Sequence, residues 1–167
     1  MIVVFDYTLK FAGVKIPFPL LPALRFDLDG VPAVLALFLY GPYSALVTCI
    51  VAFVAILARS GAVLGASMKA LAEFTTILGM IPFYKVTSSR LRPLALVFGV
   101  STRVLVMVLA NLVAWPFLFK SMETAIAFIP FLVLFNAIAG AISIAGGYVI
   151  YEAVAKRASH LLPNKKT

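Results

Sequence analysis

The chain has 167 residues, of which 63% are hydrophobic and only 12% charged, and its mean hydropathy is +1.11. A soluble globular domain is about 45–50% apolar and about 25% charged, so this composition excludes a soluble domain and a disordered tail. Lysines and arginines outnumber acidic residues 14 to 6, which gives a net charge of +8. In a chain this apolar, the positive charge indicates cytoplasmic loops rather than nucleic-acid binding.

The apolar runs predict an all-α integral membrane protein with six transmembrane helices, each needing ~20 residues to cross a bilayer. The first run, residues 1–13, is short for a crossing. The other predicted helices cover Val31–Tyr40, Tyr43–Ala58, Ala62–Phe83, Pro93–Phe119 and Thr124–Ala155. The last run is too long for one crossing, and Pro130 is expected to divide a lead-in segment from the helix proper. Residues 1–157 therefore form one predicted domain, and residues 158–167 form a polar, basic tail.

The segment from Val14 to Gly30 contains Pro17, Pro19 and Pro22. Three prolines at this spacing exclude a regular helix, because each removes a backbone donor and clashes with the preceding turn. The aromatic and aliphatic residues between them favour a structured loop that is folded onto the protein.

The distribution of positive charge predicts the orientation. Six crossings place both termini on one side, and a cytoplasmic location for them puts seven lysines and arginines in cytoplasmic segments against four outside. The positive-inside rule favours this arrangement. The Pro-rich loop would then be extracellular, and the chain would be a multi-pass protein of the plasma membrane.

Ionisable residues inside predicted spans are costly and point to function. Glu73 and Arg103 lie at similar depth on consecutive predicted helices, so an ion pair between them is geometrically plausible. Lys69 lies one turn from Glu73 on the same face and has no obvious acidic partner, which makes it the better candidate for binding a ligand.

Two asparagines join Lys69 in the outer halves of the last three predicted spans. Asn111 and Asn136 each carry an amide with two donors and two acceptor lone pairs, which suits a flat heterocycle with carbonyls and ring nitrogens. Hydrogen bonding between helices is the alternative role for such residues. Together, Lys69, Asn111 and Asn136 favour a shared pocket that faces outward.

Small residues repeat at four-residue spacing at Ser44, Thr48 and Ala52, which allows close helix approach within this chain or to a partner. Catalytic signals are missing from the sequence: there is no phosphate-binding loop, no serine–histidine–aspartate set and no cluster of metal ligands. The single cysteine, Cys49, excludes a disulfide framework. We therefore expect neither an enzyme, nor a metal site, nor a covalently bound cofactor.

The sequence also resembles a known family. The order Pro17-Phe18-Pro19, Pro22-Ala23-Leu24-Arg25-Phe26-Asp27, Val31-Pro32-Ala33 and Gly41-Pro42 is similar to the first loop and second helix of the substrate-binding S components of energy-coupling factor (ECF) vitamin transporters, above all the riboflavin-specific type. The similarity continues in Ala70-Leu71-Ala72-Glu73-Phe74, Ala110-Asn111 and Phe135-Asn136.

The resemblance implies a six-helix fold that binds riboflavin or a related vitamin from outside, beneath the first loop. Asn111 and Asn136 match asparagines that contact the flavin ring, and Asp27 matches an acid of the first loop. As a lid, this loop would bury Phe18, Leu20 and Leu21 on closing over the ligand. Transport would require a transmembrane coupling subunit and two cytoplasmic ATPase subunits. From the spacing of the small residues, we expect the coupling subunit to dock along Ser44, Thr48 and Ala52.

Two of the chain's departures from the family pattern concern the expected site most directly. Glu73 stands where an asparagine is usual, and Ala139 stands where a lysine is usual. Lys69 could replace that missing cation. Biotin, thiamine or folate is therefore an alternative ligand, and two alternative classes of function are a small membrane enzyme acting on a lipid-linked substrate and a purely structural membrane subunit.

Overall fold

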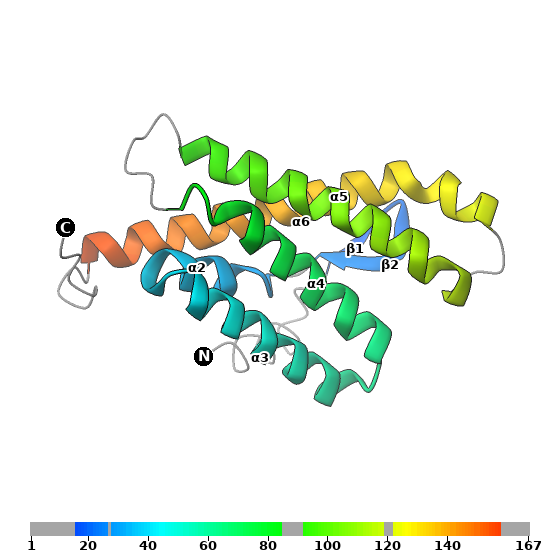
Figure 1. Ribbon diagram of the computed structural model, residues 1–167, viewed down its shortest axis with the longest axis horizontal. Helices are drawn as coiled ribbons and strands as arrows, with labels where there is room; N and C mark the ends of the chain where they lie inside the picture. Colours follow the sequence, from blue (N-terminus) through cyan, green and yellow to red (C-terminus); the bar gives the residue numbers. More distant parts are fainter. Residues whose placement is uncertain (1–15, 27, 85–91, 119–121, 158–167) are drawn as a thin grey trace.

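The computed structural model describes residues 16–26, 28–84, 92–118 and 122–157 (Figure 1). The elements in chain order are β1 (Ile16–Phe18), β2 (Leu21–Phe26), α2 (Val31–Tyr40), α3 (Pro42–Ser60), α4 (Val63–Met80), α5 (Arg92–Leu118) and α6 (Met122–Arg157). The first predicted span, residues 1–13, and the predicted tail, residues 158–167, lie outside the described residues. The described part is thus helical except for one hairpin.

Within the described ranges, four helices are long and apolar enough to cross a membrane: α3, α4, the Pro93–Ala114 part of α5, and α6. α2 is equally apolar but has only 10 residues, which at ~1.5 Å per residue is about half of a bilayer core. The predicted multi-pass membrane protein is therefore confirmed at this level.

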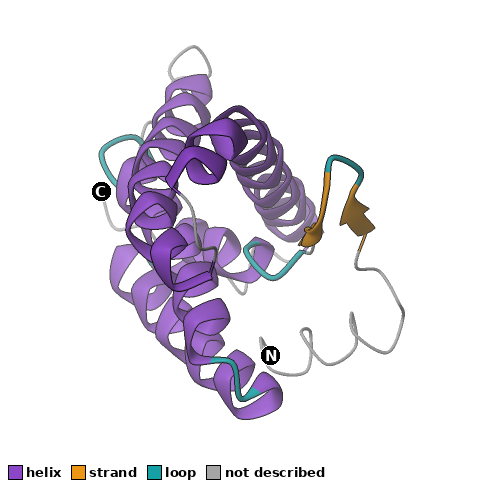
Figure 2. Ribbon diagram, turned by 90° about the vertical axis from the view of Figure 1, so that its right-hand side faces the viewer, coloured by secondary structure: helices purple, strands orange, loops and turns teal. Residues whose placement is uncertain are grey.

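The helices pack in a closed cycle. α2 lies against α3 and α6, α3 against α4, α4 against α5, and α5 against α6. Figure 2, an end-on view, shows the helices around a common centre, with the hairpin outside them. A residue that points inward from one helix can consequently meet residues from several others.

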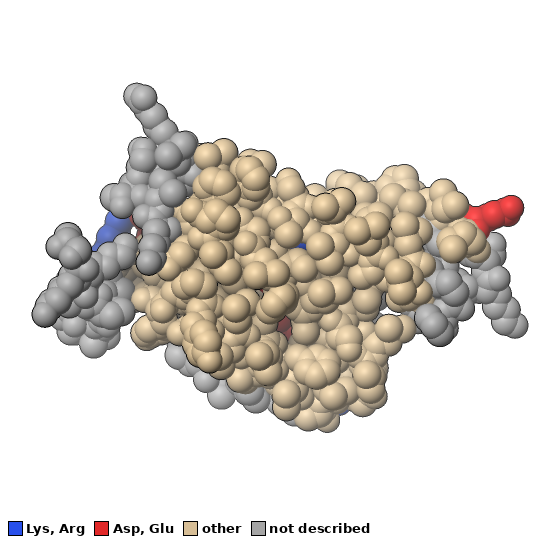
Figure 3. All heavy atoms as spheres, viewed as in Figure 1, with Lys and Arg blue, Asp and Glu red and all other residues tan. Residues whose placement is uncertain are grey.

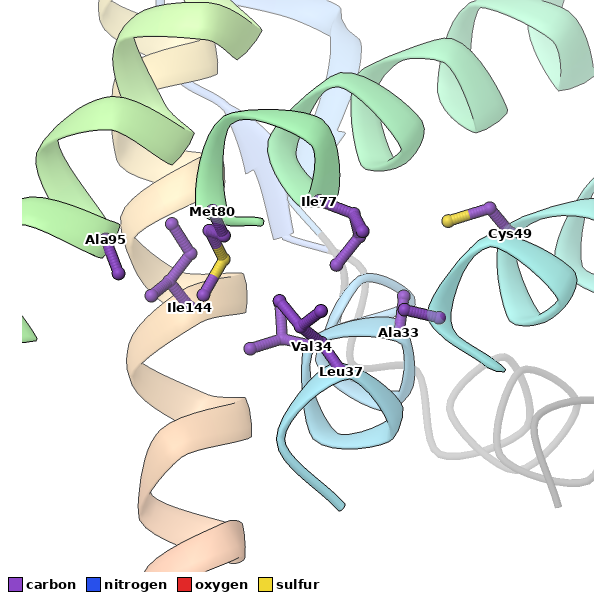
Figure 4. Packing of buried hydrophobic residues seen from close by; sticks show 9 residues of the cluster. Ala33, Val34, Leu37, Cys49, Ile77, Met80, Ala95 and Ile144 are labelled. Carbon is purple, nitrogen blue, oxygen red and sulfur yellow. The ribbon is translucent and has the colours of Figure 1, made fainter. Parts of the chain in front are cut away.

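An apolar core fills the part of the bundle around α2 (Figure 4). Val34 and Leu37 of α2 are fully buried there, between Ile77 and Met80 of α4 and Ile144 of α6. The close approach of α2 to α6 depends on Gly147, because a Cβ at this position would lie 2.6 Å from the Cβ of Val34. α2 therefore starts beside the centre of the bundle and runs along its core.

The bounds of α2 match the prediction, because glycine and proline mark its end. Gly41 adopts φ 95° and donates its N–H to the carbonyls of Ala36 and Leu37, at 3.2 and 3.0 Å. This left-handed conformation favours glycine. Pro42 then begins α3, at a position where the missing N–H of proline has no helical partner to lose.

The predicted division of the last helix at Pro130 is wrong. α6 is one helix of 36 residues that contains Pro130. Proline is tolerated in transmembrane helices because local adjustments and neighbouring groups satisfy the freed backbone carbonyl. With a rise of ~1.5 Å per residue, α6 is about 54 Å long, which exceeds the ~30 Å hydrocarbon core.

The Pro-rich segment forms a β-hairpin, whereas its three prolines predicted a structured loop. β1 and β2 are antiparallel and pair Ile16 with Phe26, Pro17 with Arg25 and Phe18 with Leu21. Both strands are edges of a two-stranded sheet, so each tolerates a proline whose nitrogen faces away from its partner. The turn at residues 19–20 lacks the glycine or asparagine that usually signals a hairpin, which is why the sequence did not predict the strands.

Candidate functional site

Aromatic rings fix the hairpin to α6. The ring of Phe26 stacks on that of Phe135, with centroids 4.8 Å apart, and the ring of Phe18 lies 5.6 and 5.7 Å from those of Phe26 and Phe135. Leu24 of β2 packs near Leu132, one turn before Phe135 on α6. Such aromatic pairs add about 0.5–1.5 kcal/mol beyond area burial, so the hairpin is a packed part of the molecule.

A polar layer, made of the charged residues Asp29, Lys69, Glu73 and Arg103, lies between this aromatic contact and the apolar core. Asp29, two residues before the start of α2, accepts a hydrogen bond from the ammonium group of Lys69 on α4. The side chain of Asp29 is 4% exposed and that of Lys69 21%. The expectation that Lys69 has no acidic partner is therefore wrong, because the acid comes from the Pro-rich segment, whose path through the bundle the sequence does not reveal.

The second pair of the polar layer joins α4 to α5. Arg103 Nη1 donates to Glu73 Oε1 at 2.9 Å and to Thr76 Oγ1 at 3.3 Å, and the side chains of Arg103 and Glu73 are 6% and 7% exposed. The predicted Glu73–Arg103 ion pair is confirmed. Burial at this depth makes pairing obligatory, because a lone charge in such a place is strongly destabilising.

The polar layer is closely packed. A Cβ on Gly30 would collide with the carboxylate of Glu73 and the hydroxyl of Ser143, so the backbone at Gly30 rests directly on both side chains. A Cβ on Gly140 would lie 3.1 Å from Cδ of Arg103, which shows that the arginine stem crosses α6 at this glycine. Residues of the β2–α2 junction, α4, α5 and α6 thus meet in one layer.

The polar layer is formally neutral, since Asp29 and Glu73 balance Lys69 and Arg103. In Figure 3 the described part of this face is almost entirely uncharged, apart from its ends and a little blue and a little red colour near the centre. Among the described residues there is no group of three or more histidine, cysteine or carboxylate side chains that could hold a metal ion. The arrangement is suited to binding by hydrogen bonds and ring contacts.

The two candidate asparagines lie on the hairpin side of the polar layer. Asn136 is 2% exposed, follows Phe135 and donates to the carbonyl of Leu132 at 2.9 Å. Asn111 is half-buried and donates to the carbonyl of Met107 at 2.7 Å. Each bond uses one amide N–H within its own helix. The acceptor oxygen and the second N–H are therefore the groups with which each amide can bind a ligand.

The contacts of Leu112 and Leu132 place the two asparagines in the same region of the molecule. Leu112, the residue after Asn111, packs near Leu132 together with Leu24 of the hairpin. Asn136 is one helical turn beyond Leu132. That the two asparagines share a pocket with Lys69 stays a prediction, and Lys69 is bound to Asp29.

The remaining expected site residues have mixed positions. Phe18 is 4% exposed and already buried by Phe26 and Phe135, while Leu20, at the tip of the hairpin, is 52% exposed. Asp27 lies outside the described residues. Of the expected docking residues, Ser44, Thr48 and Ala52 lie half-buried on α3, and the hydroxyl of Thr48 donates to the carbonyl of Ser44 at 2.7 Å.

Comparisons with known proteins bear on the fold. No family model matches the chain, and no curated protein does. Three chains of solved structures match. One of them is the S component of a bacterial ECF transporter, which is 25% identical, with a TM-score of 0.78 over 93% of this chain and 92% of that chain. The chain therefore has the fold of an ECF transporter S component, which is a transporter subunit and not an enzyme.

Proposed function

We propose that the chain is the vitamin-binding S component of an ECF-type importer, and that its ligand is riboflavin or a related flavin. The observation that carries this proposal is the similarity to an ECF S component over almost the whole chain. Its partners are then a transmembrane coupling subunit and two cytoplasmic ATPase subunits in the plasma membrane.

The site in this proposal lies beneath the hairpin, where Asn111 and Asn136 offer amide groups and Phe18, Phe26 and Phe135 offer ring faces. A flavin ring system is flat and carries carbonyls and ring nitrogens, so it matches both kinds of group. Lys69 and Glu73 border this region from α4, each held by an ion pair. Leu20 and Asp27 belong to the proposed lid.

The proposed orientation places the hairpin outside the cell and the termini in the cytoplasm. It rests on the distribution of positive charge along the chain and on the position of the hairpin in the half of the bundle away from the C-terminal end of α6 (Figure 1). A vitamin would then enter from the outer side and stop above the polar layer.

Spectroscopy of the purified chain tests the ligand. We expect flavin absorbance in protein purified from riboflavin-supplemented cells, and quenching of flavin fluorescence when riboflavin is titrated into the stripped protein. Biotin, thiamine and folate serve as competitors. Displacement by one of these, without flavin binding, would replace riboflavin by that vitamin. Absence of binding by all four would contradict the proposed site.

A further inference from the structure

The junction between the hairpin and α2 is attached to α4 by a polar contact. Asp29 lies in this junction, and its carboxylate is bound to the ammonium group of Lys69. Asp29 is separated from the last residue of β2, Phe26, by two residues. A movement of the hairpin away from the bundle therefore pulls on the Asp29–Lys69 pair.

The next residue, Gly30, fits against the bundle through its missing side chain. Its backbone rests on the Glu73 carboxylate and the Ser143 hydroxyl, and a Cβ would collide with both. Glu73 cannot yield easily, because Arg103 holds its other oxygen at 2.9 Å. The junction is thus seated on α4 and α6 at a position that only glycine allows.

The two ion pairs of the polar layer differ in their access to solvent. Lys69 is 21% exposed, so water can replace Asp29 at its ammonium group when the pair separates. Arg103 and Glu73 are only 6% and 7% exposed, and separating them leaves two buried charges without a counterion. The Asp29–Lys69 pair is consequently the one that opens, while the Glu73–Arg103 pair remains intact.

We propose that Asp29, Gly30, Lys69 and Glu73 form a latch that holds the hairpin on the helix bundle, and that the hairpin lifts only when the Asp29–Lys69 ion pair opens. The inference rests on the proposed function in one respect, namely that the hairpin covers the ligand site. The latch itself is measurable without any ligand, so the two proposals fail independently.

Cysteine labelling of the ligand-free protein tests the latch. Cys49 is the only cysteine, and Cys49→Ala gives a background without thiols. Val31→Cys then reports on the junction, because Val31 follows Gly30, is 3% exposed and packs against Gly146. Leu20→Cys, at the exposed hairpin tip, gives the labelling rate of an accessible thiol. Ile77→Cys, fully buried in the core, reports loosening of the whole fold.

We expect Lys69→Met to accelerate maleimide labelling at Val31→Cys by about tenfold or more, since protection against local opening falls with the stability of the closed state. Gly30→Ala should act in the same direction. Exchanging the charges, by Asp29→Lys together with Lys69→Asp, should restore much of the protection. Lys156→Met breaks the exposed ion pair with Glu152 and should leave the rate unchanged.

Two results would overturn the latch. The first is an unchanged labelling rate at Val31→Cys in both Lys69→Met and Gly30→Ala. The second is an equal acceleration at Ile77→Cys, because the pair would then support the whole fold and not a local closure. Labelling changes that follow our expectation in a protein that binds no vitamin would leave the latch standing and remove the proposed function.

Discussion

At the scale of single residues, the polar groups inside this membrane protein fall into two kinds. Asp29 with Lys69 and Glu73 with Arg103 form ion pairs, in which Glu73 Oε2 and Arg103 Nε remain without a hydrogen-bond partner in the part of the chain that the structure describes. Asn111 and Asn136 use only one N–H each, within their own helices. The asparagines thus retain hydrogen-bonding capacity for a ligand, while the charged residues form the polar layer beneath the proposed ligand site.

Replacing either asparagine tests its role in binding. Asn111→Ala and Asn136→Ala should each weaken vitamin binding by about 1–3 kcal/mol, because a polar group of the ligand is left unpaired. Fluorescence titration gives the dissociation constants. Ser101→Ala, an exposed polar position on the same helix as Asn111, serves as the control and should bind like the parent protein. Unchanged constants in both asparagine variants would remove these residues from the site.

The buried ion pair makes a separate prediction for stability. Arg103→Met should destabilise the protein by about 3–5 kcal/mol, since it leaves the buried Glu73 carboxyl group without its partner. The double variant Arg103→Met with Glu73→Gln should recover part of this loss. Thermal unfolding in detergent measures both. Additive shifts would show that the two side chains are energetically independent.

At the scale of elements, the helix ends and the depth of charged groups are readable from the sequence. Glycine and proline set the bounds of α2, and equal distances from the connecting loop predicted the Glu73–Arg103 pair. The hairpin and the Asp29–Lys69 pair were missed for one common reason. Both depend on how the Pro-rich segment folds back onto the bundle, and neither its turn residues nor its composition encode that path.

Close helix packing gives the prediction at this scale. A Cβ on Gly79 of α4 would lie 2.6 Å from the carbonyl oxygen of Phe98 on α5, a backbone atom that cannot turn away. Gly79→Ala should therefore destabilise the protein by about 1–3 kcal/mol, as overpacking does. The matched change Gly65→Ala, whose Cβ meets nothing closer than 3.9 Å, should be neutral or stabilising by up to ~1 kcal/mol. Thermal unfolding of the two variants compares them, and equal shifts would contradict the packing of α4 on α5.

At the scale of the whole molecule, the fold matches that of a transporter subunit. The sequence contains no phosphate-binding loop, so under the proposed function the energy for transport comes from other subunits. The fold alone does not define the ligand, since sites are built on a common scaffold by a few residues. For this reason, the sequence predicted the fold more specifically than it predicted the vitamin.

Uptake measurements test whether this chain binds the vitamin while other subunits supply the energy for transport. The chain alone in proteoliposomes should bind the vitamin without accumulating it, and Ala52→Trp on α3 should abolish uptake by the assembled transporter while sparing binding. Ala58→Trp, an exposed position near the end of the same helix, should have a smaller effect. Concentrative uptake by the chain alone would contradict the proposed function and favour an independent transporter.

The order of the charged residues along the chain has a consequence for biosynthesis. Lys69 and Glu73 reach the membrane on the same helix, four residues apart, where they can neutralise each other while that helix is inserted. The partner of Lys69, Asp29, has then already been synthesised, whereas Arg103, the partner of Glu73, follows on the next helix. A central arginine opposes insertion by about 2.5–3.5 kcal/mol. The insertion of α5 is therefore favoured once Glu73 is in place, and each of the two buried cations, Lys69 and Arg103, is synthesised after its acidic partner.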